Sequence, residues 1–149
     1  MISDKTVEKR LGVLSRDIAQ RTPGTGDFPT AVEGLQLFRR NETAPPVSCL
    51  VPPSIVLVAD GAKIMWVGGE PYEYNAEKFL ITSLDLPASS EVLQASTSRP
   101  CVGVAYKLDQ RFNKFSTATS EIGSELYYFR PGWPLRNKAK RHYGSVISR

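Results

Sequence analysis

Histidine is nearly absent from this 149-residue sequence, in which His142 is the single example. In small β-barrels, sites for iron, nickel, copper or zinc need two or three neutral imidazole ligands, so a site of that kind is excluded. The same scarcity leaves no Ser-His-Asp or Cys-His arrangement for nucleophilic catalysis. We therefore expect no metal, no cofactor, no catalytic residue and no enzymatic activity.

Long apolar runs are absent as well. The longest fully apolar run covers residues 55–59, whereas a membrane-spanning helix needs roughly 20 apolar residues. The N-terminal stretch "MISDKTVEKR" mixes both charge signs where a secretory signal would need an apolar segment. These two features predict a cytoplasmic protein without a membrane span.

Cysteine occurs only at Cys49 and Cys101, without the CxxC spacing of zinc sites or thioredoxin-like redox sites. Both lie in apolar surroundings, where free cysteine behaves as a small buried hydrophobic residue. We expect two reduced core residues, and a disulfide between them is the alternative.

Positive charge is confined to one end of the chain. Residues 1–110 carry 11 Lys and Arg against 13 Asp and Glu, whereas residues 111–149 carry 8 against 2, so the net charge of +4 comes from the C-terminal segment. The body is therefore not expected to bind DNA by itself. Basic and aromatic residues mixed within residues 130–144 would support only weak, salt-sensitive binding to nucleic acid.

Apolar residues at helical spacing open the chain. Their intervals of 4, 3 and 4, behind a cap at Ser3 or Asp4, predict a helix over residues 4–20. The next stretch, "RTPGTGDFPTAVEG", contains two prolines and three glycines and predicts an irregular, extended arm. Residues 1–34 are thus a helix and an arm. The apolar stripe of the helix consists of Val7, Leu11, Leu14 and Ile18.

Short β-rich segments fill residues 35–109 and predict an antiparallel barrel or sandwich. The pairs Asp60-Gly61 and Gly68-Gly69 are two-residue hairpin signals, which would join three successive strands into a meander. A proline cannot donate a hydrogen bond to a neighbouring strand, so the strand with "EPYEY" belongs at an edge. The predicted strands read LQLFRR, SIVLVAD, AKIMWV, EPYEY, KFLITSL, SEVLQAS and CVGVAYKL.

Residues 110–149 are predicted to form a basic C-terminal segment that is helical over a short length or irregular. Apolar residues recur there at near-helical spacing, while Gly123 and the Ser/Thr cluster at residues 116–120 oppose a helix. No helix-turn-helix pattern fits this segment. The apolar residues of this stripe are Phe112, Phe115, Ile122, Leu126 and Phe129.

Aromatic residues on either side of the glycine pair are the candidate ligand-binding residues. Side chains alternate along a strand, so Trp66 shares a face with Ile64, and Tyr72 shares a face with Tyr74. If all three aromatic side chains point inward, their apolar bodies and hydrogen-bonding tips line a cavity suited to a small polar metabolite. Ordinary packing of the barrel is the alternative for Trp66, Tyr72 and Tyr74.

Three blocks of the sequence resemble the N-terminal domain of AraC-type transcriptional regulators, over residues 3–109. The blocks are "FPTAVEGLQLFRR", "PPSIVLVADGAKIMWVGGEPYEYNAEKFLITSLDLPASSEVLQAS" and "RPCVGVAYKLD". The order of elements is similar too: a short helix, an arm with threonine and proline, a strand leading to "VLVADG", the glycine pair with "YEY", and "DLP". The chain departs from the family at residues 75–78, which lack the usual glycine.

The resemblance implies a cupin-like antiparallel β-barrel or sandwich that senses a small effector and helps the regulator to dimerise. In that family a separate C-terminal domain with two helix-turn-helix units contacts DNA, and no such domain is recognised after Asp109. We therefore expect a truncated regulator: a homodimeric sensing domain whose ligand is a small polar metabolite. The alternatives are a stand-alone protein that forms mixed dimers with a full-length regulator, and a metal-free cupin-like ligand-binding protein.

Overall fold

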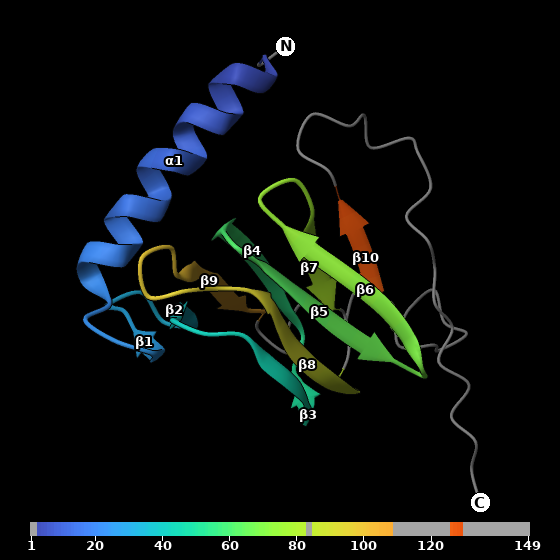
Figure 1. The fold of residues 1–149 in the computed structure, drawn as a ribbon. Coiled ribbons are helices and arrows are strands. Elements are labelled where there is room, and N and C mark those ends of the chain that lie inside the picture. Colours follow the sequence, from blue (N-terminus) through green and yellow to red (C-terminus); the bar gives the residue numbers. More distant parts are fainter. Residues whose placement is uncertain (1–2, 83–84, 109–125, 130–149) are drawn as a thin grey trace, which may run out of the picture.

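The computed structural model describes residues 3–82, 85–108 and 126–129, which form one helix and ten strands in two sheets (Figure 1). The predicted mainly β fold with an N-terminal helix is confirmed. The helix α1 spans Asp4–Arg21. The strands are β1 (Gly26–Pro29), β2 (Leu35–Arg40), β3 (Ala44–Val51), β4 (Ser54–Asp60), β5 (Ala62–Val67), β6 (Glu70–Asn75), β7 (Phe79–Thr82), β8 (Leu86–Gln94), β9 (Cys101–Lys107) and β10 (Leu126–Phe129).

The two sheets enclose the core between them. The strand order is β1-β2-β9-β4-β7-β10 in the first sheet and β3-β8-β5-β6 in the second, and the described pairings are antiparallel. Side chains alternate along each strand, so each sheet turns one face inward. Both cysteines are free; Cys101 is a core residue as predicted, whereas Cys49 is half-buried and packs against the core. The core residues are Phe38, Val51, Val58, Met65, Val67, Tyr72, Tyr74, Leu80, Leu86, Val92 and Cys101.

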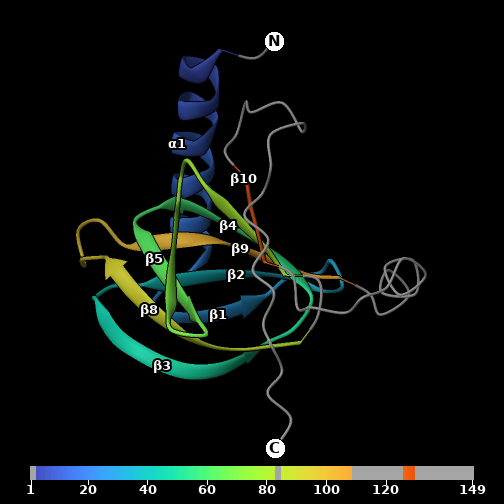
Figure 2. The same cartoon turned by 90° about the vertical axis from the view of Figure 1, so that its right-hand side faces the viewer.

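The helix α1 packs against the outer face of the first sheet. Ile18 is buried there against Ala59 of β4 and Val102 of β9. The helix predicted over residues 4–20 is therefore confirmed, and its N-terminal half extends past the sheets (Figure 2). Among the residues that the structure describes, no helix is long and apolar enough to cross a membrane.

Arg39 on β2 closes the C-terminal end of α1. Its guanidinium donates hydrogen bonds to the carbonyl oxygens of Ala19 (3.3 Å) and Thr22 (2.7 Å). The buried Thr22 hydroxyl in turn donates a hydrogen bond of 2.7 Å to the carbonyl of Ile18. Carbonyl groups near a helix C-terminus lack partners within the helix, so these contacts attach the end of α1 to the sheet.

Each of the seven predicted strands is present, and β2, β4 and β5 have the predicted bounds. The sequence reading missed β3, because Pro45 and Pro46 argue against a strand. The structure accommodates both prolines at the edge of the second sheet, where the pairing with β8 shifts register between Ala44 and Val47. A bulge at an edge strand is a position where missing backbone donors cost little.

The two glycine turns differ from each other. Gly68 and Gly69 have φ angles of 57° and 82° and join β5 to β6, so the predicted hairpin is confirmed, with Pro71 on an edge strand. Asp60-Gly61 forms no hairpin, because β4 and β5 belong to different sheets. The predicted meander of three successive strands is therefore wrong.

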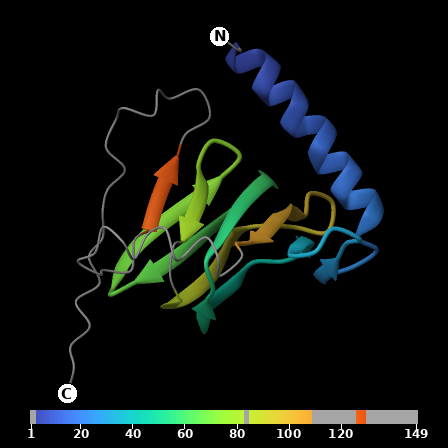
Figure 3. The same cartoon turned by 180° about the vertical axis from the view of Figure 1, so that it is seen from behind.

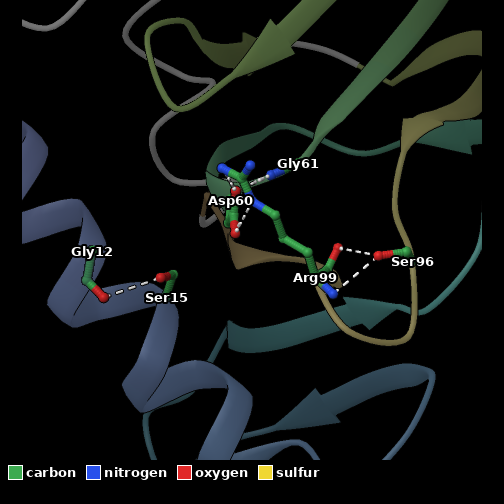
Figure 4. Close-up of polar contacts among 6 residues, drawn as sticks. All are labelled: Gly12, Ser15, Asp60, Gly61, Ser96 and Arg99. Carbon is green, nitrogen blue, oxygen red and sulfur yellow. Dashed lines mark hydrogen bonds and ion pairs between the residues drawn. The ribbon is translucent and has the colours of Figure 1, made fainter.

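Gly61 instead lets the chain cross from the first sheet to the second. Its φ is 85°, and a Cβ atom there would lie 2.6 Å from the Gln94 carbonyl oxygen and 2.7 Å from Cβ of Cys101. No other residue type fits without strain. Figure 4 shows how the crossing is held: the Asp60 carboxylate accepts hydrogen bonds from the Gly61 amide (2.9 Å) and from Arg99 Nε (3.1 Å).

The first sheet also gains a strand from each flanking segment. The arm predicted to be irregular contains β1, which pairs with β2 and places Asp27 opposite Phe38. Leu126 and Phe129, predicted within a helical stripe, lie in β10, which pairs with β7 at the edge remote from α1 (Figure 3). Both predictions are therefore wrong. Unpaired backbone groups at a sheet edge favour pairing with an extended segment, and the composition of a segment does not show whether such an edge lies beside it. The rest of that stripe lies outside the described residues: Phe112, Phe115 and Ile122.

Candidate functional site

Two of the three candidate ligand-binding residues lie on the inner face of the second sheet. Tyr72 is 8% exposed and Tyr74 is 1% exposed. Their partners across the β5–β6 pairing are Met65 and Lys63, respectively. Directly paired residues of antiparallel strands share a face. The inner face at this position therefore carries two tyrosines, a methionine and a lysine.

Trp66 lies on the opposite, outer face of β5. It pairs with Pro71, and its indole Nε1 donates a hydrogen bond of 2.7 Å to Glu91 Oε2 on β8. The structure therefore brings Tyr72 and Tyr74 together and separates Trp66 from them. The condition that all three aromatic side chains point inward is therefore not met.

A charged group that the sequence reading did not select lies beside Tyr74. The Lys63 Nζ atom is 5.1 Å from the centroid of the Phe38 ring and 5.9 Å from that of Tyr74. Arg40 Cζ is 5.9 Å from the centroid of Phe38. Cations at these distances are attracted to the faces of aromatic rings. We call Phe38, Arg40, Lys63 and Tyr74 the Lys63 cluster. The sequence feature that could have indicated it is a lysine that alternates with Met65 and Val67 on an apolar strand face.

Burial shifts the ionisation of these groups. It lowers the pKa of Lys63, and the positive charge of Arg40 lowers it further. Burial raises the pKa of Tyr74, and a hydrogen bond with the Ser90 side chain opposes that change. Burial also raises the pKa of the Cys101 thiol to about 11, so this neighbour of the cluster carries no negative charge at neutral pH.

Arg40 connects the Lys63 cluster to the arm strand β1. Its Nη2 atom is 2.8 Å from Oδ1 of Asp27, and its Nη1 atom donates a hydrogen bond of 2.8 Å to the Gly26 carbonyl. The Asp27 side chain is 53% exposed and that of Arg40 is 25% exposed. Lys63 forms no ion pair within the part of the chain that the structure describes. Arg40 therefore pairs with a half-exposed carboxylate, and Lys63 has no carboxylate partner among the described residues.

A surface hollow of about 780 Å³ lies at the other end of β2. It takes in residues from the β1–β2 connection and from the end of β9, including Glu33, Gln36 and Tyr106. None of the predicted ligand-binding residues lines it. The Lys63 cluster involves the last residues of β2, so the hollow and the cluster are separate features.

The cluster offers hydrogen-bond donors on an otherwise apolar inner face. Lys63 and Arg40 both contact the Phe38 ring, and Lys63 also contacts the Tyr74 ring. Over the described residues, no three His, Cys, Asp or Glu side chains are grouped as a metal ion would require. Ammonium and guanidinium groups only donate hydrogen bonds, so a polar partner of Lys63 or Arg40 has to be an acceptor.

Two antiparallel sheets with an outer helix and an inward-facing polar cluster define a β-sandwich domain. Residues 31–114 match the family model of the AraC-type transcriptional regulator N-terminus, which is more than half of the chain. The chain belongs to this family.

Two further comparisons add little to the family match. A search of curated proteins finds no match. Among solved structures, ToxT from Vibrio cholerae is similar with a TM-score of 0.40 and 12% sequence identity, over 64% of this chain and 41% of that chain. The match thus covers less than half of the length of ToxT.

Proposed function

We propose that this domain senses a small polar effector between its two sheets and takes part in the dimerisation of an AraC-type regulator. The observation that carries the proposal is the position of Arg40, which contacts Phe38 of the inner cluster and also binds Asp27 and Gly26 of the arm. DNA contact would belong to a helix-turn-helix domain, and α1 is the one helix among the described residues. The proposed location is the cytoplasm.

The mechanism couples ligand binding to the arm strand. A ligand that hydrogen-bonds to Tyr74 or Lys63 changes the charge and the space around the Phe38 ring, which both cations contact. Arg40 then redistributes its hydrogen bonds between the ligand and β1. Because β1 has only four residues and lies at the sheet edge, a small change in these contacts is enough to shift its attachment.

The experiment that tests sensing is a thermal-shift screen of sugars, amino acids and organic acids, repeated with two matched variants. Tyr74→Phe removes one hydroxyl from the inner cluster, whereas Tyr106→Phe removes one from the surface hollow. We expect a ligand that raises the Tm of the wild type, with the increase reduced by Tyr74→Phe and retained by Tyr106→Phe. The reverse pattern would place the ligand in the hollow, and a silent screen would contradict sensing.

Dimerisation is proposed to use the half of α1 that extends past the sheets (Figure 2). Val7 and Leu11 continue the apolar stripe there, and both side chains are partly exposed. Apolar side chains on a projecting helix favour contact with a second surface. Sedimentation equilibrium should show a dimer that Leu11→Glu dissociates and that the control Gln20→Glu, at the exposed far end of the helix, leaves intact. A wild-type monomer at high concentration would contradict this role.

A further inference from the structure

We propose that two copies of this chain associate by a reciprocal contact, in which the projecting half of α1 of each protomer packs on the outer face of the partner's first sheet. The inference rests on the proposed dimerisation through α1 and adds to it the surface that α1 binds. Two observations carry it: an apolar row on that outer face which α1 of the same chain leaves uncovered, and an apolar stripe on α1 of which one half is packed.

The first observation is a row of apolar residues across four neighbouring strands. Tyr106 of β9 pairs with Leu35 of β2 and with Ile55 of β4, and Ile55 pairs with Ile81 of β7. Directly paired residues of antiparallel strands share a face. Tyr106 lies two residues from Val104, which packs against the hydrophobic cluster under α1, so this face is the outer one. We call Leu35, Ile55, Ile81 and Tyr106 the outer row.

The outer row is accessible in the part of the chain that the structure describes. Tyr106 is 41% exposed and the other three side chains are half-buried. Among the described residues, none of the four belongs to either hydrophobic cluster. The row carries no charge, and at its β2 end it meets the surface hollow, which is also lined by Val32, 56% exposed. A contiguous apolar surface of this kind favours contact with a partner.

The second observation is the divided apolar stripe of α1. Its C-terminal half, with Leu14 and Ile18, packs on the outer face of the first sheet. Val7 and Leu11, one and two turns nearer the N-terminus, are partly exposed and belong to neither hydrophobic cluster of the described residues. They lie in the half of the helix that extends past the sheets (Figure 2). The projecting half therefore presents the same kind of side chain that already packs on this sheet.

The dimensions of the two surfaces also fit. Leu35 and Tyr106 lie two residues along their strands from Leu37 and Val104, the pair that packs under α1, and two residues of a strand span about 7 Å. Neighbouring helices pack with their axes about 8–10 Å apart. A partner helix beside α1 would therefore lie over the outer row. A two-fold axis makes the contact occur twice and closes the assembly at two copies.

The test exchanges charges between the two surfaces. Leu11→Lys places a cation on the projecting half of α1, and Tyr106→Glu places an anion in the outer row at a position that is already exposed. Each variant alone alters both copies of the contact, and sedimentation equilibrium should show dimerisation weakened by roughly tenfold or more. An equimolar mixture should recover the dimer, because a mixed dimer has one wild-type contact and one contact between opposite charges. The control Leu50→Glu, at a 66% exposed position of the second sheet, should dimerise like the wild type.

Three results would overturn the inference. One is a dimer that Leu11→Lys disrupts and Tyr106→Glu leaves intact, because α1 would then contact another surface; the proposed role of α1 in dimerisation would stand. A lower Tm of Tyr106→Glu with an unchanged dimer would place the cover of the outer row within the same chain. The third is a mixture of the two variants that remains monomeric although both have the circular dichroism spectrum of the wild type.

A further measurement needs no variant to fold. Isotope-filtered NMR of a mixture of ¹³C-methyl-labelled and unlabelled wild-type protein detects contacts between the two copies. We expect nuclear Overhauser effects between the methyl groups of Val7 or Leu11 in one copy and the Tyr106 ring in the other. Their absence from a wild-type dimer would overturn the inference alone, whereas a wild-type monomer would contradict the proposed dimerisation as well.

Discussion

Replacing Gly103 with alanine is expected to destabilise the fold and to displace the aromatic ring at the centre of the Lys63 cluster. Gly103 lies in β9 between β2 and β4, and it is buried. A Cβ atom there would collide with the carbonyl oxygen of Leu57 and would lie 2.8 Å from Cε1 of Phe38. Adding a methylene to a packed core costs about 1–3 kcal/mol. We expect a loss of about 3 kcal/mol in the free energy of unfolding, because one obstructing atom belongs to the backbone of β4 and cannot rotate away.

The assay is urea-induced unfolding followed by circular dichroism, with Gly12→Ala as the matched control. Gly12 lies in α1 and has no heavy atom within 4 Å of an added Cβ (Figure 4 shows its position). The same substitution there should stabilise the protein by about 0.5–1 kcal/mol, because alanine loses less backbone entropy in a helix than glycine does. Equal stability of Gly103→Ala and the wild type would refute the close approach of β2, β9 and β4.

Three further predictions concern the charged and aromatic residues of the two faces. Asp27→Asn should lower the free energy of unfolding by at most about 1 kcal/mol, since the ion pair is partly exposed, yet it should speed proteolysis of the arm; unchanged cleavage would argue against the role of Asp27 in holding β1. Folding lowers the pKa of Lys63. At pH values between the pKa of Lys63 in the folded protein and its ordinary pKa, the unfolded chain therefore binds more protons than the folded chain. Wild-type stability relative to Lys63→Met should therefore rise with pH across that alkaline window in chemical denaturation, and parallel curves would contradict the burial of the ammonium. Trp66→Phe should leave effector affinity unchanged in calorimetric titration, because the indole lies on the outer face with Glu91; a large loss of affinity would place the ligand outside the sheets.

Several elements could be predicted from the sequence because their signals are local. The helix α1 follows from apolar residues at intervals of 4, 3 and 4, and each of those contacts depends on neighbours one turn away. The β5–β6 hairpin follows from Gly68-Gly69, since positive φ at both central positions belongs to a two-residue turn. The match of residues 31–114 to a family model has the same origin in consecutive blocks of sequence.

At Asp60-Gly61 the local sequence does not determine which structure forms. The pair has the composition of a hairpin turn, but β4 finds its partners in β9 and β7, and β5 finds its partners in β6 and β8. Glycine permits a positive φ for a tight hairpin and for a crossing between sheets alike. Competition among distant strands decides between the two outcomes. The same competition explains why the proline-containing segment β3 and the segment β1 of the glycine-rich arm form strands.

The sequence by itself determined which residues of β5 share a face: Lys63 with Met65, and Trp66 with Ile64. Alternation is a property of the extended backbone and needs no tertiary contact. Only the tertiary structure decided which of the two faces is inside, because that choice depends on where the first sheet and its Phe38 and Arg40 lie. An aromatic residue and a lysine are both amphipathic, so composition favoured Trp66 for the interior, and packing between the sheets placed Lys63 there instead.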